Sequence, residues 1–174
     1  VAGHLRDEKD PMRAAKAVRR LPDTSLIQIV HMGKAIDNTY RDVAVEEMSQ
    51  NARYHWVGEV PRWQVRQEMA RARAMVISSR QEGGANVVSE AIMAGLPAIA
   101  SKINGNVGLL GADYQGYFPT EDTLALAKLL MRLETDKGFF KALSAQVRAL
   151  RPEFTEKREL AAWKSLLASL NQGA

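Results

Sequence analysis

The sequence contains no cysteine, which excludes disulfides and thiolate metal sites and agrees with a reducing compartment. It also lacks any apolar run approaching the roughly 18–20 residues that a transmembrane helix needs. Its three histidines are scattered, without carboxylates at ligand spacing, which argues against a metal site, and we expect His31 to be structural. These absences favour a soluble protein without a bound metal, and cytoplasmic is the expected location.

The chain also lacks a strong excess of positive or negative charge. The chain has 24 Lys and Arg against 20 Asp and Glu, a net charge of +4 over 174 residues, with 46% hydrophobic residues. This length and composition suit one globular domain. The small positive excess suits an anionic small ligand, but the positive charge is too sparse for nucleic-acid recognition. The densest basic segment lies in a predicted amphipathic helix, where arginines form a solvated face: Arg62, Arg66, Arg71 and Arg73. We therefore expect no nucleic-acid partner.

Short apolar runs alternate with helical patterns along the chain. Strands are predicted at 1–3, 26–30, 54–57, 74–78, 98–101 and 116–119, and helices at 11–21, 37–50, 61–72, 86–94, 121–133, 138–150 and 155–170. The alternation predicts an α/β fold, a Rossmann-like three-layer α/β/α domain with a parallel sheet. We expect this domain to span 1–152, with chain missing upstream of its first strand. Residues 153–174 then form a C-terminal helix that packs back or toward a further domain.

The polar loops of this pattern follow its strands. They cover residues 4–9, 31–34, 58–60, 79–85 and 102–106. In a parallel sheet such loops converge at the carboxyl ends of the strands, where α/β proteins bind ligands. We therefore expect the functional site at this edge, with residues 102–108 as an open loop rich in glycine and asparagine.

The strongest functional signal is the loop that leaves the fourth predicted strand and opens a helix. Gly83 and Gly84 allow the backbone to come close to a ligand. The N–H groups of Ala85, Asn86 and Val87 in the first helical turn are unpaired and point at that ligand. A helix N-terminus of this kind is an anion site.

Two glutamates accompany this anion site. A helix over 86–94 places Glu90 on its polar face, looking back toward the loop that holds Glu82. Its buried face would consist of Val87, Val88, Ala91 and Ile92. Gly95 fits the position after the helix, and Pro97 turns the chain into the next strand. Carboxylates repel a phosphate, so both glutamates make more sense as acceptors for hydroxyl groups.

The pattern resembles the signature of the GT-B glycosyltransferases of the large retaining family 4, a Glu, seven residues, then Glu-Ala-x-x-x-Gly-x-Pro. Five residues match it in register: Glu82, Glu90, Ala91, Gly95 and Pro97. In that family the first Glu contacts donor-sugar hydroxyls, the second the ribose hydroxyls, and the amides between them the diphosphate. The resemblance implies these roles for Glu82, for Glu90 and for the backbone of Gly83, Gly84, Ala85, Asn86 and Val87.

The first polar loop extends the resemblance. In the family it reads Gly-Arg-Leu followed by a Lys, and the two basic residues hold the diphosphate. Lys9 matches the Lys and is implied to stabilise the leaving group, His4 occupies the Arg position, and Arg6 is a possible substitute. The turn at Gly58 would lie by the nucleobase and the loop with Gly105 near the sugar. Because no Asp-x-Asp motif is present, we expect binding without a metal or other cofactor.

Simpler interpretations remain for each of these residues. Glu82 is also explained as an acidic residue near a helix N-terminus, worth roughly 0.3–1 kcal/mol. Glu90 is equally consistent with a solvated helix position and Lys9 with an exposed loop. Trp56 and Trp63 suggest base stacking, yet tryptophans in a strand and a first helical turn more often pack.

The resemblance implies the donor-binding half of a retaining glycosyltransferase. Such an enzyme moves a sugar from a nucleotide diphosphate sugar, with UDP as the first choice, to an acceptor bound by an N-terminal domain absent here. The runs 83–90 and 105–111, with Asp113 and Tyr114, also resemble a narrower branch, the selenosugar synthases of selenoneine formation. The alternatives are a non-catalytic nucleotide-binding α/β domain, and a GT-B epimerase or phosphorylase.

Overall fold

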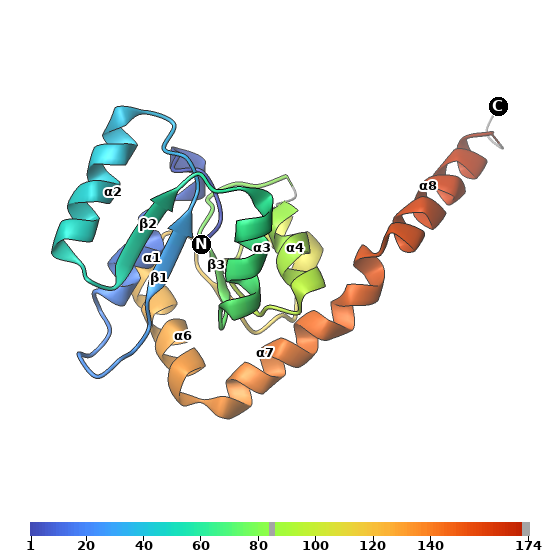
Figure 1. Cartoon of the computed structure of the whole chain (residues 1–174). Helices are drawn as coiled ribbons and strands as arrows, with labels where there is room; N and C mark the ends of the chain where they lie inside the picture. Colours follow the sequence, from blue (N-terminus) through green and yellow to red (C-terminus); the bar gives the residue numbers. More distant parts are fainter. Residues whose placement is uncertain (84–85, 172–174) are drawn as a thin grey trace.

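The computed structural model describes residues 1–83 and 86–171. Parallel strands alternate with helices, as the sequence predicts (Figure 1). The strands are β1 Ile29–Met32, β2 Tyr54–Gly58, β3 Met75–Ile77, β4 Ala98–Ser101 and β5 Tyr117–Phe118. The helices are α1 Arg13–Val18, α2 Asn38–Gln50, α3 Arg62–Arg71, α4 Asn86–Ala94, α5 Asn104–Leu110, α6 Thr123–Thr135, α7 Lys137–Leu150 and α8 Glu156–Asn171, with 3-10 turns η1 Asp7–Lys9 and η2 Arg151–Phe154.

The described strands pair in two groups rather than in one continuous sheet. β1 pairs with β2, and β3 pairs with β4, which pairs with β5, all in parallel. Ala2 adds a parallel bridge to Met32 beside the first group. Between β1 and β3, on the side where these strands begin, lies a cavity of about 490 Å³. Most of its lining is apolar, and none of the predicted functional residues borders it.

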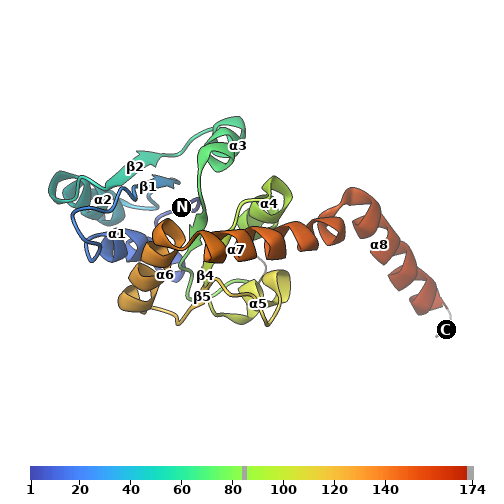
Figure 2. The same cartoon turned by 90° about the horizontal axis from the view of Figure 1, so that it is seen from below.

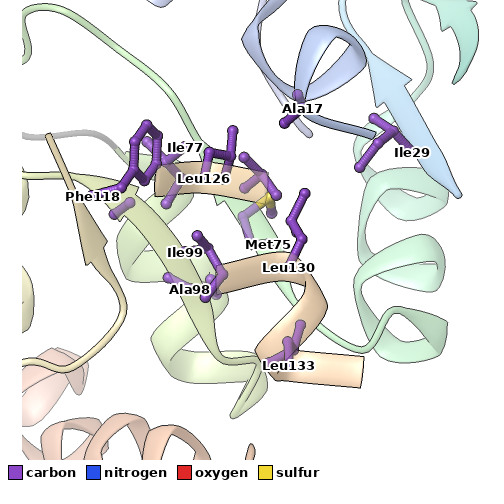
Figure 3. Close-up of a cluster of buried hydrophobic side chains, with 14 of the residues drawn as sticks. Ala17, Ile29, Met75, Ile77, Ala98, Ile99, Phe118, Leu126, Leu130 and Leu133 are labelled. Atoms are coloured by element: carbon purple, nitrogen blue, oxygen red, sulfur yellow. The ribbon is translucent and has the colours of Figure 1, made fainter. Parts of the chain in front are cut away.

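The core lies between the β3–β4–β5 sheet and the helices that cover it. Figure 3 shows Ile77 and Ile99 from the strands facing Leu126 and Leu130 of α6, with Phe118 beside them. These side chains are buried because α6 packs against β4, β5 and α1. Burial of each such side chain contributes roughly 1.5–3 kcal/mol, which fixes the strands whose ends carry the site.

The β3–α4–β4 unit agrees closely with its prediction. α4 begins at Asn86 and buries three of the four residues expected on its apolar face, Val88, Ala91 and Ile92, whereas Val87 is only partly buried. Gly95 is left-handed with φ 70°, and the N–H of Leu96 donates to the carbonyl of Ala91 at 2.9 Å, which closes the helix. Pro97 then leads directly into β4. This unit carries Glu82 in the loop before α4 and Glu90 in α4 itself.

Several boundaries differ from the sequence-based expectation. α1 begins at Arg13 with Met12 as N-cap, because Asp10 adopts a left-handed conformation and its carboxylate pairs with the Arg13 side chain. The strand expected at 26–30 lies later, at Ile29–Met32. The prediction of an open loop at residues 102–108 is wrong. Asn106 donates to the carbonyl of Ser101 at 2.9 Å, and the chain forms helix α5.

The last helix leaves the body of the molecule. Figures 1 and 2 show α8 running outward beyond the end of α7, with η2 between them. Leu160, Trp163 and Leu167 on this helix are each more than half exposed. The helix predicted after residue 153 is therefore present, with apolar side chains turned to solvent.

Candidate functional site

A cleft of about 440 Å³ opens at the carboxyl ends of β1, β2 and β3. It is bordered by four stretches that the sequence placed at this edge. Its lining comes from the amino-terminal segment (Ala2, Gly3, His4, Arg6, Lys9), the end of β1 (Met32, Gly33), the turn after β2 with α3 (Glu59, Val60, Val65) and the start of α4 with its loop (Glu82, Asn86, Val87, Glu90). Four of the five loops predicted to converge at this edge therefore do so, whereas residues 102–106 do not line the cleft.

Glu82 and Lys9 meet in this cleft, although 73 positions separate them in the chain. The Lys9 ammonium forms an ion pair with Oε1 of Glu82. The Ser79 hydroxyl donates to the same oxygen at 2.6 Å. The two charged side chains are only 20% and 10% exposed, so the pair is partly desolvated and less screened by salt than a surface pair. Glu82 is thus fixed by bonds to Oε1 while its carboxylate borders the cleft.

The conformation around Glu82 depends on Gly105 of α5. A Cβ on Gly105 would lie 2.2 Å from the Glu82 carbonyl oxygen and 3.0 Å from the Glu82 Cβ, closer than real contacts allow. Ser101 donates to the carbonyl of Ser79 at 2.6 Å and ties β4 to the same loop. Gly105 therefore packs against the site loop and does not line the cleft.

Glu90 lies across the cleft, on the second turn of α4. Arg62, the first residue of α3, donates to its Oε1 through Nη2 at 2.8 Å and Nε at 3.2 Å. Arg62 is 72% exposed, and an ion pair in that setting contributes about 0–1 kcal/mol. Arg62 is therefore a weak partner, and the Glu90 carboxylate can accept other hydrogen bonds at little cost.

The first turn of α4 faces the same space. Asn86 and Val87 both border the cleft, as predicted, so the positive end of the helix dipole points into it. Gly83 is exposed at the end of the loop. The predictions for Gly84 and Ala85 lie outside the described residues.

The electrostatics of the cleft are mixed rather than uniformly positive. Lys9 and Arg6 bring cations, and Glu59, Glu82 and Glu90 bring carboxylates. Arg6 forms an ion pair with Glu8 at 3.1 Å, and His4 accepts a hydrogen bond from the N–H of Lys34 at 3.0 Å. Cations suit phosphate oxygens and carboxylates suit hydroxyls, so the cleft fits a ligand that carries both groups.

His31 is structural, as expected. It is 1% exposed, its Nε2 donates to the carbonyl of Gly3 at 3.1 Å and its Nδ1 accepts from the Tyr54 hydroxyl at 2.9 Å. Burial lowers the pKa of His31 to about 3, so the ring is neutral. Trp56 donates from Nε1 to the carbonyl of Gly33 at 2.8 Å, and Trp63 is 65% exposed away from the cleft lining. The packing interpretation of Trp56 is therefore the better one.

Within residues 1–83 and 86–171, no three His, Asp or Glu side chains gather as a metal ion would require. None of the helices in these ranges has the length and apolar character to cross a bilayer. Binding without a metal stays a prediction.

Residues 1–150 match the model of a protein family described as "Glycosyl transferases group 1". The chain belongs to this family. No curated protein is similar enough in sequence to count as a relative. The match covers the whole cleft of this group 1 glycosyltransferase domain, from the amino-terminal segment to α7.

Solved structures give the same fold. HepE from Anabaena in complex with UDP aligns at a TM-score of 0.80 and 19% identity, over 97% of this chain and 48% of that one. HepE in complex with UDP-glucose aligns at a TM-score of 0.79 and 18% identity, again over 97% of this chain and 48% of that one. Sucrose-phosphate synthase from Thermosynechococcus elongatus aligns at a TM-score of 0.77 and 21% identity, over 99% of this chain and 46% of that one. The chain thus spans about half their length and matches one half of a GT-B structure, which confirms the predicted fold class.

Some residues of this glycosyltransferase domain that shape the site were not found from the sequence. Ser79 binds Glu82 and Arg62 binds Glu90, yet neither stands out in a motif. Gly58 was predicted to lie by the nucleobase, but it does not line the cleft, and Glu59 and Val60 line it instead. The carbonyl of Gly58 accepts a hydrogen bond from the N–H of Gly33 at 2.8 Å. Contacts that join loops far apart in sequence leave no local pattern that could have revealed them.

Proposed function

We propose that this chain is the donor-binding half of a retaining group 1 glycosyltransferase, and that its cleft holds a nucleoside diphosphate sugar. One observation carries the proposal. The Lys9–Glu82 pair, Glu90 and the N-terminus of α4 border a single cleft at the strand ends. The family supports it, and so does HepE, which is solved with UDP and with UDP-glucose. A UDP-sugar is therefore the first donor to test.

Each group in the cleft has a distinct role in this proposal. Glu90 accepts hydrogen bonds from the ribose, while Lys9, Arg6 and the N-terminus of α4 hold the diphosphate. The Lys9 ammonium has three N–H donors, so it can bind Glu82 and phosphate oxygens together. When the bond between the sugar and the diphosphate breaks, this cation stabilises the negative charge of the leaving group.

Glu82 faces the donor sugar in the same scheme. Its Oε1 is held by Lys9 and Ser79, and its carboxylate accepts hydroxyl groups of the sugar. Because Glu82 and Lys9 are coupled, the sugar is oriented relative to the leaving group. These two residues are the proposed catalytic pair.

The acceptor side lies in a further domain of the same enzyme. A two-domain transferase closes its cleft over both substrates, so residues 1–152 by themselves bind the donor without transferring it. We assign residues 153–174 to contact with that domain. Leu160, Trp163 and Leu167 on α8 are exposed on a helix that leaves the body of this one.

Ligand-observed NMR of the isolated chain with a panel of nucleotides and nucleotide sugars tests the proposal. UDP and UDP-glucose should give saturable signals that compete with each other. Lys9→Gln should weaken UDP binding roughly tenfold to a hundredfold, the value of a hydrogen bond to a charged group, whereas Lys128→Gln, at an exposed position of α6, should not. Absence of saturable binding by any nucleoside diphosphate at millimolar concentration contradicts the proposal.

The narrower branch is tested on the full-length enzyme. If it is a selenosugar synthase, a UDP-sugar and a selenium-containing acceptor should yield a selenium-linked sugar by mass spectrometry. Transfer to oxygen acceptors alone contradicts this. Free sugar or orthophosphate as a reactant would instead identify an epimerase or a phosphorylase, and nucleotide binding without any turnover a non-catalytic domain.

A further inference from the structure

Asp10, the residue after Lys9, is held in an unusual state. Its backbone is left-handed, with φ 45° and ψ 58°, a region that residues other than glycine rarely occupy. Its carboxylate is only 6% exposed and lies between two arginines. Arg13 Nε is 2.6 Å from its Oδ2, and Arg80 Nη2 is 3.9 Å from its Oδ1.

The backbone of this segment is bound to the exit of β3. The Ser78 hydroxyl lies 2.9 Å from the carbonyl of Asp10 and 3.1 Å from that of Lys9. The backbone N–H of Arg80 donates to the carbonyl of Glu8 at 2.8 Å. The turn that carries Lys9 is therefore attached to the loop that carries Glu82.

The guanidinium groups extend the attachment to the start of α6 and the residues just before it. Arg80 donates to Oε1 of Glu121 at 2.9 Å, and Arg13 donates to the hydroxyl of Thr123 at 2.7 Å. Arg80 also donates to the carbonyl and to the carboxylate of Asp7. The cluster thus holds three carboxylates and two guanidinium groups, and its members do not line the cleft, whereas Lys9 does. The cluster therefore supplies no cation to a ligand and acts on the cleft only through Lys9.

We propose that Asp10 is a positioning residue that directs the Lys9 ammonium toward Glu82 and the donor diphosphate. Its buried carboxylate, clamped by Arg13 and Arg80, holds the left-handed turn from which Lys9 extends. The inference rests on the proposed function, because it presumes that Lys9 binds the diphosphate. It goes beyond that function by assigning a role to a residue that touches no substrate.

The sign of one substitution separates positioning from direct electrostatics. Asp10→Asn keeps a side chain that tolerates the left-handed region and removes one negative charge. If Asp10 acted on the ligand only through its field, losing this charge should tighten binding of an anion. Positioning predicts the reverse, a weaker complex, because Lys9 loses its fixed direction.

The test is a double-mutant cycle on the whole chain, with UDP affinity measured by calorimetry for wild type, Asp10→Asn, Lys9→Gln and the double variant. Asp10→Asn should weaken UDP by about fivefold or more when Lys9 is present, and by less than about twofold when Lys9 is replaced. Asp42→Asn, whose carboxylate is 68% exposed beside Arg41, is the matched control and should leave affinity unchanged.

Two further variants guard against a folding defect, which circular dichroism would reveal. Arg80→Gln removes one clamp from the opposite side and should show the same coupling to Lys9. Asp10→Gly accepts the left-handed backbone freely but lacks the carboxylate, so it should weaken UDP as Asp10→Asn does. If Asp10→Asn fails to fold, a double-mutant cycle of Arg80→Gln with Lys9→Gln decides whether the positioning role holds.

The outcomes separate this inference from the function beneath it. Unchanged or tighter UDP binding by Asp10→Asn, full affinity in Asp10→Gly, or equal losses with and without Lys9 overturns the positioning role while the donor site stands. If wild type does not bind UDP, or Lys9→Gln changes nothing, the proposed diphosphate site itself fails and the inference with it.

Discussion

Substituting Gly105 by alanine should misplace Glu82 without touching the ligand. The added Cβ would stand 2.2 Å from the Glu82 carbonyl oxygen, whereas ordinary contacts begin at 3.4 Å. Helix α5 and the Glu82 loop must therefore separate by roughly 1 Å, a clash against backbone that no rotamer change relieves. The φ of Gly105 lies outside the left-handed region, so alanine is accepted by the backbone and the effect is purely steric.

The expected loss follows from the size of this displacement. A misplacement of about 1 Å can cost roughly a hundredfold in rate, which is about 2.7 kcal/mol of barrier. Turnover of the full-length enzyme should fall by that order. Calorimetry on the isolated chain should show weaker binding of UDP-glucose with UDP binding nearly intact, since Glu90 and Lys9, which make the proposed ribose and diphosphate contacts, are carried by segments other than the displaced loop.

Gly108 in the same helix provides the matched control. A Cβ there meets nothing within 4 Å, so Gly108→Ala should leave transfer unchanged and stabilise α5 by up to about 1 kcal/mol. Full turnover by Gly105→Ala, or equal losses for UDP and UDP-glucose, would refute the assigned dependence of Glu82 on Gly105.

Three further predictions concern pH, metal and turnover. The free energy of unfolding should fall as the pH drops from about 6.5 toward 3, by up to about 1.4 kcal/mol per unit, because the unfolded chain protonates His31 while burial holds its folded pKa near 3. His31→Gln should flatten this slope, and an unaltered slope would contradict the assignment. A chelator should leave UDP affinity unchanged, and a large loss would mean that the phosphate site is misassigned. The isolated chain should not transfer sugar, and steady turnover with an acceptor present would contradict the need for a second domain.

The sequence predicted best where the determinants are local. The β3–α4–β4 unit follows from a short apolar run, a glycine-rich loop, one amphipathic helix and the stop at Gly95 and Pro97, and its bounds are nearly those observed. The error at α5 has an equally physical origin. Glycine and asparagine favour loops on their own, but Asn106 is buried and bonded to Ser101, and this tertiary contact outweighs propensity.

The candidate site shows the same division. Alternating strands and helices indicated that the loops meet, and Lys9 and Glu82 do meet. Their particular pairing, the Ser79 bond and the clamp around Asp10 depend on side chains that become neighbours only after folding. The helix predicted from residue 11 begins two residues later, because Pro11 is a common first helical residue while the left-handed backbone of Asp10 depends on contacts with Arg13 and Arg80 that form only on folding.

The most direct test of the donor-site account is a calorimetric comparison of Glu82→Gln and Glu90→Gln, each titrated with UDP and with UDP-glucose. Glu90→Gln should weaken both ligands alike, by roughly tenfold to a hundredfold, because both carry the ribose. Glu82→Gln should leave UDP nearly intact and weaken only the sugar nucleotide. If the two variants behave equally toward both ligands, or if either tightens both by removing repulsion from the phosphates, the roles assigned to these glutamates are wrong.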